Sequence, residues 1–236
     1  MKITSFSRIG QYHQQTDTEN QDAIHYSKKN GVYVISLADG VSECKEAKCG
    51  AETASSAITN LLVNKGRNLL QYDKTQMAGF VLSHITAELE YCAARDDTNI
   101  IEYSSTIASV YLDMINQTLV SFNLGDSMIL AVENGRVYIF SMPSDSTSGC
   151  FVTTTRDAEN NISIKTVSTN KMECIVIFSD GAWKHLFKGN KLKPEIIKIF
   201  ENKEFEKLKV YLNQQNCFDD CSFIALIMSE KDVHDG

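Results

Sequence analysis

Residues 173–183, ECIVIFSDGAW, combine a short apolar run with an abrupt polar end. The run at 174–178 is rich in β-branched residues and too short for a typical helix, so it predicts a strand that is buried on both faces. Asp180 and Gly181 follow directly after Ser179. A carboxylate is therefore expected just beyond the end of a buried strand.

The same construction occurs twice more in the chain. The segment 32–40, VYVISLADG, ends in an Asp-Gly pair at Asp39, and Asp219 and Asp220 precede the apolar run 221–228, CSFIALIM. In an antiparallel sheet, the C-terminal end of one strand lies beside the N-terminal end of its neighbour. Three buried strands are therefore expected to bring their carboxylates to one sheet edge.

A fourth carboxylate follows from hairpin geometry. Asp22 precedes an expected strand at 23–27, and the turn sequence KKNG at 28–31 leads into the strand at 32–38, so folding about this turn brings Asp22 close to Asp39. Crowded carboxylates repel one another unless a cation neutralises them, and oxygen-only ligands suit magnesium, manganese or calcium better than zinc. The sequence therefore predicts a divalent metal site. The alternative for any single Asp-Gly pair is an ordinary turn.

Composition limits the classes of protein to which the chain can belong. The 236 residues are 43% hydrophobic and 22% charged, enough for a single domain spanning residues 1–236. A net charge of -7 and a pI near 5.3 argue against a nucleic-acid surface.

The 7 cysteines include no C-x-x-C pair, and Cys174 and Cys221 lie in apolar runs, which fits a reducing compartment. The N-terminus is too polar for a signal peptide, and no apolar stretch reaches the roughly 18 residues of a membrane span. We expect a cytoplasmic monomer without membrane or nucleic-acid partners.

Periodicity along the chain predicts two blocks of strands accompanied by helices. Helical apolar faces are expected at 49–63, 75–94, 194–200 and 205–212. Further strands are expected at 2–9, 105–113, 118–124, 128–133, 136–140, 151–155 and 162–167, with polar connections at 10–21 and 141–148. This pattern predicts an α+β fold in which two antiparallel β-sheets pack as a sandwich with helices on the outer faces. Such packing explains strands that are apolar on both sides.

Taken together, these motifs resemble the metal-dependent protein phosphatase family, the PP2C-like serine/threonine phosphatases, in its compact bacterial form. The resemblance covers nearly the whole chain. It rests on NQDA at 20–23, ADGV at 38–41, STIASVYLD at 105–113 with NLGDSMILAVENGRV at 123–137, FSDGAW at 178–183, and DDCSFIAL at 219–226. Each motif is weak alone, but five in the right order form a strong signal. The fold of that family is the helix-covered sandwich that the periodicity predicts.

The resemblance implies a role for each carboxylate. Asp39 would bridge two metal ions, and Asp180 and Asp219 would hold the first of them. Asp22 would support the second ion, directly or through water. Asp126 matches a position that helps to hold a third, weaker ion in several members, with a simple turn as the alternative. The expected cofactors are two or three Mg2+ or Mn2+ ions. The implied catalytic residues are Asp22, Asp39, Asp180 and Asp219, and the implied metal ligands are these four with Gly40 and Asp126.

The function implied by the resemblance is hydrolysis of phosphoserine or phosphothreonine in a phosphoprotein, in opposition to a serine/threonine kinase. Two adjacent cations lower the pKa of a shared water and shield the approach of hydroxide to a negative phosphate. No nucleophilic side chain is then required. Neither Cys44 nor Cys49 has an arginine at the C-x5-R spacing that a cysteine phosphatase needs, so these two cysteines are not predicted nucleophiles.

The sequence departs from the family at the position that binds the substrate phosphate. An arginine commonly lies five residues before the first-motif aspartate, where this chain has Asp17. Arg8, His13 and Asp220 are the candidates for contacts with the phosphate. Because the usual arginine is missing, two alternatives remain: a weak or inactive member that serves as a binding or sensing module, and a hydrolase of a small phosphorylated metabolite.

Overall fold

The computed structural model describes residues 1–146 and 149–228. Its helices are α1 (Gln11–Gln15), α2 (Ala47–Leu69), α3 (Lys74–Arg95), α4 (Asp180–Trp183), α5 (Pro194–Glu201) and α6 (Phe205–Asn213), with 3-10 turns at Ile100–Tyr103, Ala158–Asn160 and Lys184–Leu186. Its strands are β1 (Lys2–Arg8), β2 (Asp22–Lys29), β3 (Val32–Asp39), β4 (Ile107–Asp113), β5 (Thr118–Leu124), β6 (Met128–Glu133), β7 (Arg136–Ser141), β8 (Asp145–Ser146), β9 (Gly149–Cys150), β10 (Ser163–Ser168), β11 (Met172–Phe178), β12 (Phe187–Lys188), β13 (Lys191–Leu192) and β14 (Cys221–Ile227).

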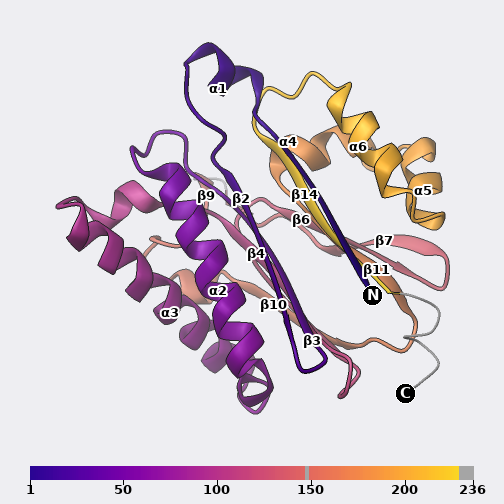
Figure 1. Cartoon of the computed structure of the whole chain (residues 1–236), viewed down its shortest axis with the longest axis horizontal. Coiled ribbons are helices and arrows are strands. Elements are labelled where there is room, and N and C mark those ends of the chain that lie inside the picture. The colour runs from indigo at the N-terminus through magenta and orange to yellow at the C-terminus, as the bar shows by residue number, and fades with distance from the viewer. Residues whose placement is uncertain (147–148, 229–236) are drawn as a thin grey trace.

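Within the described residues, two five-stranded antiparallel sheets face each other. One sheet has the strand order β1-β14-β11-β6-β7, and the other has the order β10-β5-β4-β3-β2. Helices α2 and α3 cover the outer face of the second sheet, while α5 and α6 lie on the outer face of the first (Figure 1). The predicted sandwich with helices outside is therefore confirmed.

Alternate residues of each central strand enter different apolar layers. In β11, Ile175 and Ile177 face the other sheet, whereas Val176 and Phe178 face α5 and α6. In β3, Ile35 likewise packs between the sheets. Because both faces of these strands contact apolar partners, the sequence shows continuous apolar runs rather than alternation.

Two predicted hairpin turns have the backbone geometry that their sequences require. Asn30 and Gly31 join β2 to β3 with φ of 49° and 76°. Asn134 and Gly135 join β6 to β7 with φ of 49° and 70°. Two successive residues with positive φ are the signature of a type I′ turn, which matches the twist of the flanking strands.

The predicted strand at 151–155 is wrong. Thr155 donates its backbone N–H to the Val152 carbonyl at 2.9 Å, and the Thr155 hydroxyl accepts from the Val152 N–H at 2.9 Å. Thr153 donates its backbone N–H to the Ser105 carbonyl at 2.9 Å. Threonine side chains can satisfy nearby backbone groups in this way, so the segment forms turns in place of a ladder.

Three other segments differ in extent from the prediction. The polar connection at 10–21 contains helix α1, and helix α2 continues beyond residue 63 to Leu69. The expected exposed loop at 141–148 includes Ser141 as the end of β7 and β8 paired with β9; its residues 147–148 lie outside the described part of the chain. No described helix is both long enough and apolar enough to cross a membrane.

Candidate metal centre

The predicted carboxylates gather at one end of the sandwich, near α1 and α4 in Figure 1. Strands β11 and β14 are neighbours in one sheet, and Phe178 pairs with Phe223, so Asp180 follows one strand beside the start of the other. Asp39 comes from β3 in the facing sheet. The prediction that all three strands bring their carboxylates to the edge of one sheet is therefore wrong in part. Strands β11 and β14 belong to the same sheet, whereas β3 belongs to the facing sheet.

The position of Asp39 is fixed by its two neighbouring strands. Asp22 lies directly opposite Asp39 in the β2–β3 ladder, as the hairpin geometry predicts. On the other side, the Thr106 hydroxyl accepts from the Asp39 N–H at 3.1 Å, and the Thr106 N–H donates to the Asp39 carbonyl at 2.8 Å. Gly40 continues this contact through an isolated bridge to Ser105. The Asp39 backbone is thus held from both sides.

Close backbone packing fixes the segment that carries Asp219 and Asp220. A Cβ atom on Gly181 would lie 2.2 Å from the Asp220 carbonyl oxygen, and one on Gly10 would lie 2.3 Å from the Asp219 carbonyl carbon. Only glycine allows the chain to approach so closely at these two points. The glycine after Asp180 therefore has a packing role that is separate from turn formation.

Several carboxylate oxygens of the cluster are buried without a hydrogen bond. Asp22 is 3% exposed, and neither of its carboxylate oxygens has a hydrogen-bond partner. Asp180 is 7% exposed, and its Oδ1 also has no partner. Burying an ionised carboxylate without donors costs several kcal/mol, which a coordinated cation offsets. With oxygen as the donor atom throughout, these residues fit magnesium or manganese.

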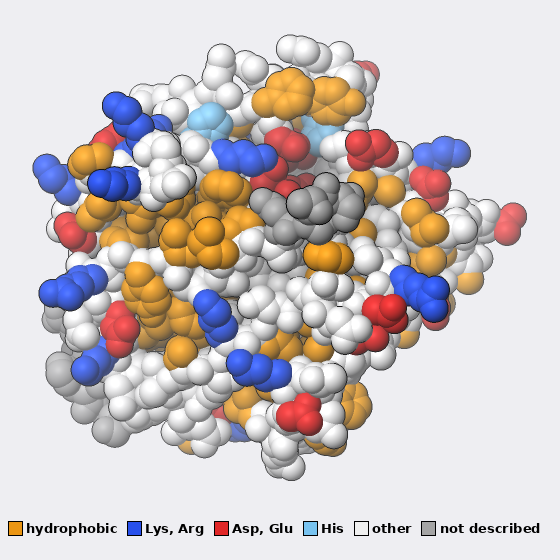
Figure 2. All heavy atoms as spheres, turned by 180° about the vertical axis from the view of Figure 1, so that it is seen from behind, with side chains coloured by type: hydrophobic (Ala, Val, Ile, Leu, Met, Phe, Trp, Pro, Cys, Tyr) orange, Lys and Arg blue, Asp and Glu red, His pale blue; other side chains and the backbone are white. Residues whose placement is uncertain are grey.

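The electrostatics agree with this geometry. Burial raises the pKa of Asp22 to about 8, and the charge of Asp180 contributes to the rise. Burial also raises the pKa of Asp39, and the neighbouring carboxylates of Asp22, Asp180, Asp219 and Asp126 raise it further. Divalent cations would relieve both effects, because they favour the ionised form of every carboxylate around them. In Figure 2, acidic side chains gather in a hollow on this face of the molecule.

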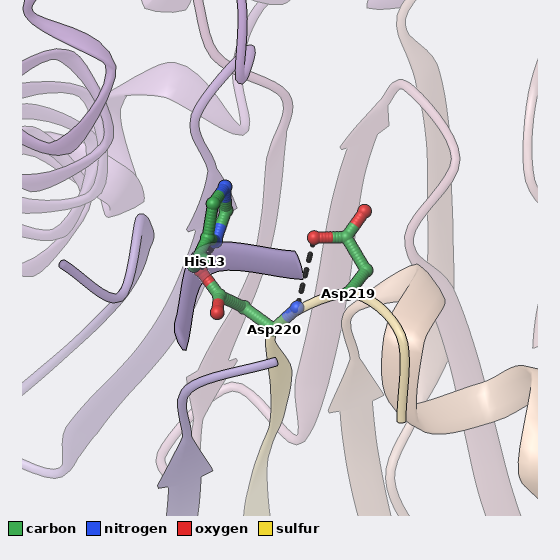
Figure 3. Close-up of side chains that lie close together, drawn as sticks. All are labelled: His13, Asp219 and Asp220. Atoms are coloured by element: carbon green, nitrogen blue, oxygen red, sulfur yellow. Dashed lines mark hydrogen bonds and ion pairs between the residues drawn. The ribbon is translucent and has the colours of Figure 1, made fainter. Parts of the chain in front are cut away.

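Asp220 has a different environment from that of Asp219. It is fully buried, and it accepts hydrogen bonds from the backbone N–H groups of Gly10 at 2.7 Å and Gln21 at 2.6 Å. Its Oδ2 also lies 2.9 Å from Nδ1 of His13, a residue of α1. Figure 3 shows the Asp220 carboxylate directed to His13, while the Asp219 carboxylate points another way. The structure therefore brings His13, Asp219 and Asp220 together, but protein donors already surround Asp220.

The sequence as a whole matches one family. The family model described as protein phosphatase 2C matches residues 9–215. The chain belongs to the protein phosphatase 2C family. The matched range includes Asp22, Asp39, Asp126 and Asp180, and it ends before Asp219. A comparison with curated proteins gives no match.

Solved structures share the fold of this PP2C family member at low sequence identity. A bacterial serine phosphatase is 15% identical with a TM-score of 0.65, covering 97% of this chain and 98% of that one. Serine/threonine phosphatase Stp1 from Staphylococcus aureus is 14% identical with a TM-score of 0.62, covering 97% and 95%. RsbX in complex with magnesium is 14% identical with a TM-score of 0.54, covering 94% and 92%. These likenesses establish the PP2C fold.

The three candidates for phosphate binding have different surroundings in this PP2C fold. Arg8 donates from both terminal nitrogens to the carbonyls of Asn213 and Gln215, at 2.7 and 2.9 Å, at the C-terminal end of α6. Both ends of its guanidinium group are therefore already engaged by these carbonyls. His13 is 2% exposed, and its Nε2 lies 3.3 Å from the Ser42 hydroxyl. Asp220 is occupied by protein donors, as described above.

Asp17, which stands where PP2C proteins commonly have an arginine, is an exposed residue just after α1 with a φ of 54°. A left-handed backbone is well tolerated by aspartate, whose short side chain can bond locally. The five-residue helix α1 before it carries His13, which lies against the buried Asp220.

Sequence reasoning missed Lys184. This residue follows α4 directly, and its Nζ donates to Oδ2 of Asp180, four residues earlier. The i,i+4 spacing was a usable signal, because residues four apart meet on one face of a helix. It depended on the chain turning into a helix immediately after the Asp-Gly pair, which the sequence suggested only as a turn.

Proposed function

We propose that this protein is a metal-dependent phosphatase that hydrolyses phosphoserine or phosphothreonine in proteins. The observation that carries the proposal is the convergence of Asp22, Asp39, Asp180 and Asp219, with buried oxygens of Asp22 and Asp180 that accept no hydrogen bond. Buried polar groups are normally hydrogen-bonded, so a cluster of buried carboxylates that bound no cation would destabilise the fold.

The proposed ligands of two Mg2+ or Mn2+ ions are Asp39 between them, Asp180 and Asp219 on one side, and Asp22 with the Gly40 carbonyl on the other. When bound, such ions supply positive charge beside the substrate phosphate and lower the pKa of a water molecule. The residues of the chain hold this site in place: Thr106 anchors the Asp39 backbone, and Gly181 allows the close approach of Asp220.

His13 is the residue that we propose for contact with the phosphate. The Asp220 carboxylate accepts a hydrogen bond from Nδ1 of His13, which orients the imidazole. Nε2 of His13 is then directed to Ser42, two residues beyond Gly40. In this arrangement Asp220 positions His13 and does not itself touch the substrate. Arg8 has no part in the proposal, because both of its terminal nitrogens donate to α6.

The comparisons support the proposal by analogy. The family model is that of a protein phosphatase, and one structural neighbour, RsbX, was solved in complex with magnesium. Nearly full coverage in both directions supports a single domain over residues 1–236. The described cysteines are free, which fits the proposed cytoplasmic setting, where a serine/threonine kinase would supply the phosphoprotein substrate. We further propose that the protein acts as a monomer.

The direct test measures release of phosphate from p-nitrophenyl phosphate and from a phosphothreonine peptide, with manganese, with magnesium and with EDTA. We expect hydrolysis of both substrates with either metal and none in EDTA. Asp39→Asn should abolish it, because this carboxylate lies between the others. Hydrolysis that persists in EDTA would refute metal dependence.

The second candidate is a binding or sensing module that keeps the PP2C fold. It is favoured by one observation: Asp17 replaces the usual arginine, and Arg8, the nearest arginine in the chain, donates to α6. Binding of manganese without hydrolysis of any phosphomonoester would establish this alternative. Hydrolysis of p-nitrophenyl phosphate but of no phosphopeptide would instead indicate a small phosphorylated metabolite as substrate.

A further inference from the structure

Lys184 places a fixed positive charge against the acidic cluster. Its Nζ donates to Oδ2 of Asp180, and the two side chains are 58% and 10% exposed. The other carboxylate oxygen of Asp180, Oδ1, is buried and accepts no hydrogen bond. One oxygen of this carboxylate therefore faces an ammonium group, and the other remains available for a different cation.

Lys184 also lies close to Asp126. The preceding residue, Trp183, donates its Nε1–H to the Asp126 carbonyl oxygen at 2.8 Å, which fastens α4 to the β5–β6 turn. Burial lowers the pKa of Lys184, but the hydrogen bond with Asp180 and the charges of Asp180, Asp126 and Asp219 outweigh it, so the pKa lies above its usual value. The ammonium group thus lies in the field of three carboxylates.

The simpler interpretation is an ordinary i,i+4 ion pair on a helix surface. Such pairs contribute little to stability, and both partners are normally solvated. Here the carboxylate partner is almost fully buried and shared with the acidic cluster. The pair is therefore part of the charge balance of the site.

We propose that the Lys184 ammonium takes the place of a third divalent ion beside Asp126 and Asp180, so that this protein binds two metal ions and not three. The inference rests on the proposed metal-dependent function and deepens it. Lys184 already donates to one carboxylate oxygen of Asp180. A third ion beside Asp180 and Asp126 would therefore be repelled at short range by the ammonium charge.

The charges of the cluster support the same conclusion. Two divalent ions and one ammonium group carry as much positive charge as the ionised carboxylates of Asp22, Asp39, Asp126, Asp180 and Asp219 carry negative charge. A third divalent ion in addition to Lys184 would leave the site with an excess of positive charge. Removing the ammonium charge would in turn leave a deficit that a further ion can fill.

The test counts bound manganese per chain in the full-length protein by equilibrium dialysis, with the free ion measured by its electron paramagnetic resonance signal. We expect two ions in the wild type and a third, weaker ion in Lys184→Met, which removes the charge and keeps the aliphatic chain. Lys184→Arg keeps the charge, and Lys188→Met removes another exposed lysine of the same region, so both should bind two ions.

The number of bound ions tests the role of Lys184 separately from the metal-dependent function. A wild type that binds three ions, or a Lys184→Met variant that still binds two, overturns the role of Lys184 and leaves the metal-dependent function intact. A wild type that binds none overturns both. Circular dichroism of each variant confirms folding, and the wild-type count decides between two and three ions even without a folded variant.

Discussion

Asp22 and Asp39 lie directly opposite each other, at the last residue pair of the β2–β3 ladder. Like charges in this position destabilise a hairpin, and the nearby hydroxyls of Ser222 and Ser179 offset only part of the effect of burial on the pKa of Asp22. The fold therefore brings together two carboxylates that oppose each other's ionisation. A divalent cation between them would attract both carboxylates and outweigh their mutual repulsion.

Without metal, the protein should lose stability as the pH rises. The pKa of Asp22 is raised from 3.8 to about 8 in the folded state, so between these values the folded protein holds a proton that the unfolded chain has lost. The free energy of unfolding then falls with pH, and Asp22 alone contributes up to about 1.4 kcal/mol for each pH unit. Thermal unfolding in EDTA from pH 5 to pH 9 measures this effect.

The control for the pH experiment is Asp22→Asn, which removes one of the two buried titrating carboxylates and should make the profile in EDTA less steep, with Asp39 still titrating. Saturating manganese should also weaken the fall in the wild type, since binding to the folded state adds stability and requires ionised ligands. A wild-type melting temperature in EDTA that is constant or rises over this pH range would contradict the assignment of Asp22.

Asp219 and Asp220 should respond differently to the same substitution. Asp219→Asn should remove most of the manganese-induced rise in melting temperature, because it removes a proposed ligand charge. Asp220→Asn should lower the melting temperature by itself, because Gly10, Gln21 and His13 surround a carboxylate that the amide can replace only in part. The loss of hydrogen bonds to a charged group is typically about 1.5 to 3 kcal/mol. Differential scanning fluorimetry with and without manganese separates the two effects. If both variants lose the manganese response equally, the division of roles fails.

Gly181→Ala should weaken metal binding although alanine favours helices. The new Cβ would lie 2.2 Å from the Asp220 carbonyl oxygen, so α4 and the Asp219–Asp220 segment must move apart. We expect at least a tenfold increase in the manganese Kd, measured by isothermal titration calorimetry. The matched control is Gly79→Ala in α3, where a Cβ would meet nothing within 4 Å. It should stabilise the fold by about 0.5 to 1 kcal/mol and leave the Kd unchanged. An unchanged Kd in Gly181→Ala would show that α4 adapts.

Asp113→Ala should destabilise the fold without affecting the metal site. Burial opposes ionisation of Asp113, but hydrogen bonds from Arg67 and Asn116 outweigh it and lower its pKa to about 2. Asp113 lies opposite Val32, at the other end of β3 from Asp39. We expect a loss of about 2 to 3 kcal/mol in urea unfolding at pH 7, since Arg67 is partly solvated and regains water. Because the folded pKa is depressed, the difference from the wild type should shrink as the pH falls below 3.8 towards 2. If Asp113→Ala also removed the stabilisation by manganese, the two ends of β3 would not be independent, and the prediction would be wrong.

Much of the fold was predictable because its signals are local. Strands β3, β11 and β14 are recognisable as apolar runs because their side chains contact the other sheet on one face and helices on the other. Turns such as Asn134-Gly135 are recognisable because these residues tolerate a positive φ. The segment 151–155 shows where this reasoning fails: its threonines favour strands by propensity, yet the Thr155 hydroxyl accepts a hydrogen bond from the nearby Val152 N–H.

The sequence by itself determined the central strands, such as β3, β11 and β14, and the aspartates at their ends, because these features are encoded by neighbouring residues. Only the tertiary structure decided how those ends meet. Asp39 reaches the cluster from the facing sheet, and Asp220 is enclosed by Gly10, Gln21 and His13 from the distant N-terminal segment. Lys184 likewise reaches Asp180 only because the chain turns into a helix at that residue. These contacts join residues far apart in the chain, or depend on backbone geometry that local sequence does not fix, and so the charge balance of the site is a property of the fold.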